Sequence, residues 1–289
     1  QIPQLLSDSL NPAFNNATDW QDLFYQTGSV NNADINISAG NEVLNYRVGA
    51  NFYDEKGIVR NTGFKRYSLR GNFDFKIAKH VNAILNFSAS RLDRKRGLGR
   101  GRDNILPING VTQPASFYAV SQTDKDFYYG QYDKQRDQNL SDIFSTYVQL
   151  NYDISKAVQY SFQGSVSNTN DKRDRFQPTE ITDDHRSFAS SENGNYQEIY
   201  LANILTATKS FKEKTHNFNA VLTQSFQLDK KTGSYIYGYN VPDNNIQIVS
   251  GIPQRDLEAY SVFQQAGLFS LLGQLSYDYK GKYIINASY

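Results

Sequence analysis

A run of basic residues carries the clearest chemistry in this sequence. Residues 91 to 102 read RLDRKRGLGRGR. Guanidinium groups donate charge-assisted, often bidentate hydrogen bonds to carboxylates and phosphates, so the run could bind an anionic ligand or an acidic partner surface. Alternatively, it is a solvated extension whose charge Asp93 and Asp103 balance. The candidate contact residues in the run are Arg94, Arg96, Arg100 and Arg102.

A second group of candidate contacts is aromatic. Aromatic rings stack on sugar rings, and tyrosine is enriched in protein interfaces. One set follows the basic run and could instead pack its loop against itself or against a neighbouring loop: Phe117, Tyr118, Phe127, Tyr128, Tyr129 and Tyr132. Tyr235 and Tyr237 form another set and alternate with single residues, so they would share one face of a strand, either as ligand contacts or as an aromatic girdle.

Signals for metal binding and catalysis are weak. The chain has no cysteine and three widely separated histidines. Glu180, Asp183, Asp184 and His185 cluster, but their spacing lacks the ligand positions and turn glycine of a calcium loop. No Ser-His-Asp order accompanies a nucleophile elbow. We therefore expect no metal, no cofactor and no enzymatic activity. The net charge of +1, from 30 basic and 29 acidic residues, predicts no nucleic-acid partner.

The elements that must position these residues are β-strands. From Tyr67 to Phe75, aromatic and aliphatic residues alternate with polar and charged ones, as on a strand with one apolar and one polar face. The same alternation recurs at 81–90, 144–154 and 158–167, among other segments. The pattern predicts ten strands and no amphipathic helix.

The connections between these strands follow a second pattern. Short turns are expected near 40–45, 76–80, 155–157, 211–215 and 280–281. Long connections alternate with them, at 54–63, 92–140, 171–195 and 230–266. Outer-membrane barrels have this arrangement, with tight periplasmic turns and long extracellular loops. Strands of about 9–11 residues suffice to cross a bilayer. The sequence therefore predicts a transmembrane antiparallel β-barrel, with a secreted all-β sandwich or jelly roll as the competing fold.

Several short motifs resemble those of SusC/RagA-like TonB-dependent outer-membrane transporters. The matching stretches are TDWQDLF at 18–24 followed by Thr27-Gly28, NADINISAG at 32–40, DEKGIV at 54–59, NTGFKRYSLR at 61–70 and LSYDYKGKY at 275–283. Their order and spacing match the family, and together they cover about residues 18–90 and 265–289.

The resemblance implies a 22-stranded barrel with a plugged lumen, covered by a SusD-like surface lipoprotein and driven by TonB–ExbBD. Such transporters import glycans or peptides through the outer membrane. Residues 1–32 would be an extracellular loop segment and 33–289 consecutive barrel strands. The plug domain and TonB box are expected to lie outside this chain. The chain starts without a methionine or a signal peptide and ends within an apparent strand, so we expect it to be a fragment.

In such a barrel the apolar faces contact outer-membrane lipid and the polar faces contact the lumen. The lumen-facing candidates are Arg70, Asn72, Asp74, Gln159 and Gln163. The basic run could then contact lipopolysaccharide phosphates, an anionic substrate or an acidic lid surface. Two other functions stay open: a secreted, soluble all-β module that binds carbohydrate or protein, and a small stand-alone outer-membrane barrel.

Overall fold

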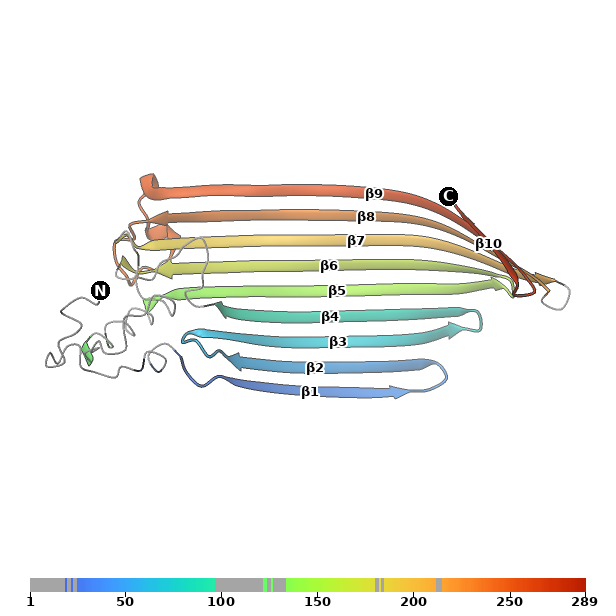
Figure 1. Ribbon diagram of the computed structural model, residues 1–289, viewed down its shortest axis with the longest axis horizontal. Coiled ribbons are helices and arrows are strands. Elements are labelled where there is room, and N and C mark those ends of the chain that lie inside the picture. The colour runs from blue at the N-terminus through green and yellow to red at the C-terminus, as the bar shows by residue number, and fades with distance from the viewer. Residues whose placement is uncertain are drawn as a thin grey trace, which may run out of the picture.

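The computed structural model describes residues 19, 22, 25–96, 122, 123, 126, 134–179, 182, 185–211 and 215–289. Ten antiparallel strands form one sheet in which every strand pairs with its neighbours along the chain (Figure 1). The strands are β1 (Ser29–Gly40), β2 (Leu44–Lys56), β3 (Thr62–Ala78), β4 (Val81–Arg96), β5 (Arg136–Ser155), β6 (Val158–Gln177), β7 (Phe188–Phe211), β8 (His216–Tyr239), β9 (Leu257–Tyr279) and β10 (Tyr283–Ser288). Two short 3-10 turns, η2 (Val249–Gly251) and η3 (Gln254–Asp256), precede β9.

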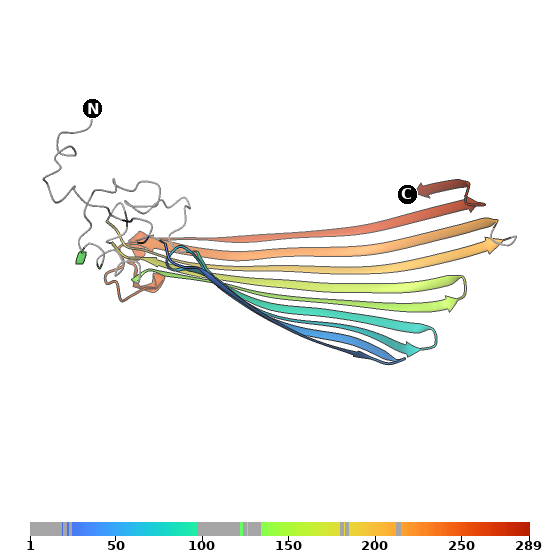
Figure 2. The same cartoon turned by 60° about the horizontal axis from the view of Figure 1, so that its bottom comes forward.

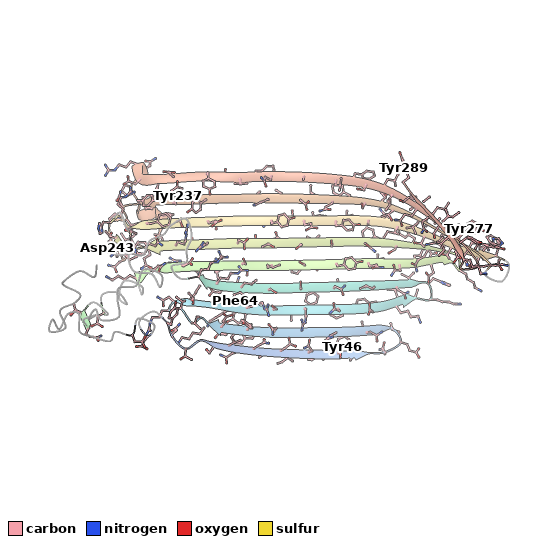
Figure 3. The ribbon with its side chains drawn as sticks, in the orientation of Figure 1. Tyr46, Phe64, Tyr237, Asp243, Tyr277 and Tyr289 are labelled. Carbon is pink, nitrogen blue, oxygen red and sulfur yellow. The ribbon has the colours of Figure 1, made fainter. Side chains whose placement is uncertain are left out.

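Short and long connections lie at opposite ends of the sheet. The ends of the strands leave 41–43, 79–80, 156–157, 212–215 and 280–282 as the short connections. The long ones gather at the other end, which Figure 3 marks by Tyr237 and Asp243, while Tyr46 and Tyr277 lie toward the short turns. The sheet is curved rather than flat (Figure 2). The predicted ten strands and their antiparallel arrangement are therefore confirmed.

The long connections are shorter than the sequence predicts, and this is a correction. The strands leave 57–61, 97–135, 178–187 and 240–256 between them, in place of 54–63, 92–140, 171–195 and 230–266. Strand pairing continues beyond the apolar stretches, as where Arg173 lies opposite Asn139 and Glu192. Backbone hydrogen bonding needs no apolar side chain, so a hydrophobic pattern marks only part of each strand.

The two faces of the sheet differ in chemistry along its whole width. We call the side that carries Leu69, Leu85 and Leu201 the apolar face, and the opposite side the polar face. Cross-strand pairs on the apolar face include Phe52 with Tyr67 and Leu150 with Phe162. Many side chains of this face are exposed; Ile35 is 68% exposed and Phe269 63%. A sheet with so much exposed apolar surface needs an apolar surrounding.

All five predicted lumen-facing residues share the polar face: Arg70, Asn72, Asp74, Gln159 and Gln163. Arg70 forms an ion pair with Asp34, with 3.2 Å between Nη2 and Oδ2. The Gln159 amide donates to Asp153 at 2.8 Å. Such neighbouring polar side chains satisfy one another across strands.

Aromatic rings gather near both borders of the apolar face. Near the short turns, the rings of Phe218 and Tyr277 lie 4.7 Å apart. Nearer the long connections, the rings of Phe52 and Tyr67 lie 5.2 Å apart. Two such belts are typical of the interfaces of a membrane barrel. Among the described residues, no helix is long and apolar enough to cross a membrane.

The buried core is small and lies beyond the exposed apolar surface, near the long connections. Phe176 and Ala189 are fully buried beneath Val241 and Ile252 of the β8–β9 connection. Gly238 permits this contact, because a Cβ there would lie 2.3 Å from the Asp256 carbonyl oxygen. The β8–β9 connection therefore folds back over the face that carries the apolar side chains.

Candidate functional site

Arginines and tyrosines meet on the polar face at the end with the long connections. One cross-strand row runs from Arg94 on β4 through Asn139, Arg173 and Glu192 to Tyr235 on β8. The next row places Arg175, Ser190, Tyr237 and Glu258 side by side. We call these residues of the two rows the arginine–tyrosine cluster. They share a face because the ladders contain no register shift in this region.

Arg175 is held in place by its neighbours on β7 and β8. Its Nε donates to Ser190 Oγ at 3.2 Å, and its Nη2 donates to the Tyr235 hydroxyl at 2.9 Å. The guanidinium carbon lies 5.3 Å from the centre of the Phe188 ring. These contacts fix the plane of the guanidinium group, and a fixed guanidinium plane suits the recognition of planar anionic groups.

Arg173 is fixed by a bidentate ion pair with Asp137. Nε and Nη2 donate to the two carboxylate oxygens at 2.9 Å and 3.2 Å. Burial is the largest single influence on the pKa of Arg173 and lowers it. The hydrogen bond and charge of Asp137, together with the charges of Glu192 and Tyr235, outweigh burial, so the pKa of Arg173 is raised overall. The cluster therefore combines fixed positive charge with nearby carboxylates, an arrangement suited to polar or zwitterionic ligands.

Aromatic rings of the cluster and of its neighbours pack together beside these arginines. The Tyr235 ring lies 5.1 Å from Tyr237 and 5.3 Å from Tyr260. Phe188 lies 5.4 Å from Tyr239, and the Arg186 guanidinium lies 4.5 Å above the Tyr239 ring. Tyr260 is the exposed ring of this group, at 59%, and Tyr235 and Tyr237 are half-buried. Tyrosine rings that are accessible in this way can stack on a ligand and hydrogen-bond to it through their hydroxyl groups.

The Tyr237 hydroxyl donates to the Glu258 carboxylate, and this bond raises the pKa of Tyr237 to about 12. An ordinary tyrosine ionises near pH 10. The stabilisation from this bond should be complete below pH 10 and lost as the pH rises through about 12. Carbon-13 NMR of ring-labelled tyrosine, assigned with Tyr237→Phe, should show a phenol that is still neutral at pH 11. A Tyr237 that ionises with the bulk tyrosines would contradict this.

The structure places some of the predicted contact residues together. Tyr235 and Tyr237 lie in the cluster, and Arg94 lies in the same row, where its Nη1 donates to Ser141 at 2.9 Å. Arg96 ends β4 opposite Thr62. The remaining predicted contacts lie outside the described residues: Arg100, Arg102, Phe117, Tyr118, Phe127, Tyr128, Tyr129 and Tyr132.

The sequence prediction missed Arg173, Arg175 and Glu192. The two arginines continue the alternation that places Gln159 and Gln163 on the polar face, and that alternation could have identified them. Of the four residues considered as a metal cluster, only His185 is described. Within the described ranges, no group of three or more histidine, aspartate or glutamate side chains could hold a metal ion.

The fold of this chain is similar to that of a solved membrane transporter. The solved RagAB peptide transporter superimposes on 96% of the chain and 33% of its own, with a TM-score of 0.75 at 18% identity. The ten-stranded antiparallel sheet therefore has the fold of part of that transporter chain. No family profile matches the chain.

Curated relatives narrow the class. TonB-dependent receptor P3 of Formosa agariphila is 25% identical over 92% of this chain and 28% of its own length. TonB-dependent receptor SusC of Bacteroides thetaiotaomicron is 34% identical over 39% of this chain and 12% of its own length. The resemblance to SusC/RagA-like TonB-dependent transporters is thereby confirmed. The chain spans about a quarter of the length of P3.

Proposed function

We propose that this chain forms part of the barrel wall of an outer-membrane, TonB-dependent importer of glycans or peptides, as the SusC-like component of a SusCD-type complex. The observation that carries the proposal is the arginine–tyrosine cluster on the polar face, at the end of the long connections. In a barrel, this position lines the entrance to the lumen.

The difference between the two faces of the sheet supports a position in a membrane barrel. The apolar face, with exposed residues such as Ile35 and Phe269, contacts outer-membrane lipid. The polar face contacts water, a plug and the substrate. A secreted soluble module would need a second layer over the apolar face, and the described residues cover only its border near Phe176. This favours the membrane barrel over the soluble alternative.

Partners follow from the resemblance. A SusD-like surface lipoprotein would cover the end with the long connections, where the substrate meets the cluster. TonB–ExbBD would act through a plug domain, so the residues of this chain position the substrate and undergo no covalent chemistry. The cluster offers binding groups only, and the proposed role is transport rather than catalysis.

The test compares two variants of the complete transporter in outer membranes. Arg175→Met removes the cation bound to Ser190 and Tyr235. Lys172→Met removes a cation from the opposite face of the same strand, where it pairs with Asp174. Because a hydrogen bond to a charged group contributes about 1.5–3 kcal/mol, Arg175→Met should weaken substrate capture by about 10–100-fold. Lys172→Met should leave it unchanged.

The measurement is energy-dependent uptake of two labelled mixtures, one of short peptides and one of oligosaccharides. Barrel amounts are matched by heat-modifiable mobility in SDS gels. Loss of uptake of only one mixture in Arg175→Met identifies the substrate class. Equal uptake of both mixtures by the wild type and both variants would contradict a role for the cluster.

A further inference from the structure

A groove of about 610 Å³ indents the apolar face close to its border with the long-connection end. Ala50 and Ala89 form low points between the larger side chains of Phe52, Tyr67 and Phe144, which stand as walls. The surface exposed inside the groove is mostly apolar, as the binding of a hydrocarbon chain requires. On this face the groove opens toward the surrounding membrane.

A polar rim closes the groove at the end nearer the long connections. It consists of Arg91, Asp142, Asn168 and Asn170. Arg91 forms a bidentate pair with Asp142, through Nε at 2.6 Å and Nη2 at 2.8 Å. A guanidinium has five N–H donors, so this pair occupies two of them and leaves the others for a ligand. The carboxylate is meanwhile neutralised by Arg91.

The two asparagines are oriented by Asn195 on β7. The Asn195 amide donates to Asn168 Oδ1 at 2.8 Å and to Asn170 Oδ1 at 2.6 Å. Because their carbonyl oxygens are occupied, both asparagines turn their NH₂ groups away from Asn195. The rim therefore offers N–H donors from three side chains at one end of an apolar groove. This combination complements a phosphate attached to an acyl chain.

We propose that this groove binds lipid A, the phosphorylated anchor of lipopolysaccharide, with an acyl chain between Phe52 and Phe144 and a phosphate on Arg91, Asn168 and Asn170. The choice of lipid A rests on the proposed function, because the end with the long connections faces outward in an outer-membrane barrel. The outer leaflet there consists of lipopolysaccharide. The interaction is distinct from substrate binding, which takes place on the opposite face.

A second hollow on the same face provides an internal comparison. It has a volume of about 410 Å³ and is lined by Leu205, Ala207, Ala220 and Leu222, among others. No arginine or asparagine lines it. It should therefore accommodate bulk lipid without selecting a headgroup.

The experiment is native mass spectrometry of the complete, delipidated transporter in detergent, with added diphosphoryl lipid A. Asn168→Asp keeps the acceptor for Asn195 but replaces the outward NH₂ by a carboxylate oxygen. Ala89→Trp fills the groove, and Ala220→Trp fills the second hollow as a matched control. Losing one charge-assisted donor and adding repulsion should weaken retention at least about tenfold in Asn168→Asp. Ala89→Trp should abolish retention, and Ala220→Trp should not change it.

Two further probes separate the sources of binding. Lipid A without phosphates and phosphatidylglycerol should both be retained at least about tenfold less than diphosphoryl lipid A. Equal retention of dephosphorylated lipid A would overturn the role of the rim, and equal retention of phosphatidylglycerol would overturn the assignment to lipid A. If Ala89→Trp fails to fold, the lipid A binding of Asn168→Asp tests the proposal by itself. The folding of each variant is checked by its heat-modifiable mobility in SDS gels.

The lipid test is independent of transport. It measures binding in detergent and needs neither substrate nor TonB. Rim variants that lose lipid A and still import peptides or oligosaccharides would support both proposals. A wild-type protein that binds lipid A but imports neither mixture would contradict the proposed function and leave the groove standing. If Asn168→Asp and Ala89→Trp retain lipid A as strongly as the wild type does, the proposed lipid site is wrong. The proposed transport function would be unaffected by that result.

Discussion

Leu85→Arg should destabilise the folded barrel by about 2–4 kcal/mol, the range measured for arginine at the bilayer midplane on the lipid face of a barrel. Leu85 lies on the apolar face between Phe73 and Val148, midway between the rows of Val81 and Ala89. An arginine there must lose its hydration or pull water and headgroups into the bilayer. Asn86→Arg is the matched control, since the adjacent residue lies on the polar face opposite Asn72.

The measurement is equilibrium unfolding of the complete protein in lipid vesicles by guanidinium chloride. Asn86→Arg should shift the free energy of unfolding by less than about 0.5 kcal/mol, because surface changes away from special contacts have small effects. Similar losses in both variants would show that the two faces are not in different solvents. A larger loss in Asn86→Arg would reverse the assignment of lipid and lumen.

Phe176→Ala should lower the stability of the packing around this residue by about 3–5 kcal/mol, as expected when a large aromatic side chain is removed from a buried site. Phe176 is fully buried and contacts the β8–β9 connection through Val241 and Ile252. The loss should be local, because this cluster lies beyond the exposed apolar surface. It should appear as opening of residues 240–256 rather than as unfolding of the sheet.

Hydrogen exchange can separate these outcomes. The Asn240 amide donates to the Ser187 carbonyl at 2.9 Å, and the Ile252 amide donates to Val249 at 3.1 Å. Both amides should lose protection in Phe176→Ala, whereas the amides of β3 should keep theirs. Phe269→Ala is the control, because that ring is 63% exposed and fills no protein cavity. Unchanged protection of Asn240 and Ile252 in Phe176→Ala would contradict the proposed anchoring.

Side-chain alternation predicted the strands because one face of this sheet carries apolar side chains and the other carries polar ones. Leu69 and Arg70 could be assigned to opposite faces from the sequence, because they are adjacent residues of one strand and one is apolar while the other is charged. The same rule failed near the long connections, where Arg173, Asp174 and Arg175 are all charged and the contrast between the faces disappears. The strand ends were therefore placed too early, although pairing continues to Gln177.

The cluster required information that the sequence pattern lacks. Within a hairpin, a two-residue turn such as 156–157 limits the register, so the proximity of Arg173 to Asn139 was accessible in principle. Between β4 and β5 the connection is long, and its length leaves the register free. The pairing of Arg94 with Asn139, which brings Arg94 into the row of Tyr235, depends on the assembled sheet. The sequence therefore identified Arg94 and Tyr235 as candidates, but not Arg173 and Glu192, which lie between them in the row.

The covering of Phe176 and Ala189 by the β8–β9 connection has a consequence for the vertical position of the protein in its membrane. Without this cover, Phe176 and Ala189 would extend the hydrophobic height of the sheet toward water. A surrounding bilayer would then have to thicken, or the barrel would have to tilt. With Val241 and Ile252 over them, the exposed apolar height ends lower on the strands. In the proposed membrane barrel, the connection would therefore reduce the apolar height that this part of the wall presents to the bilayer.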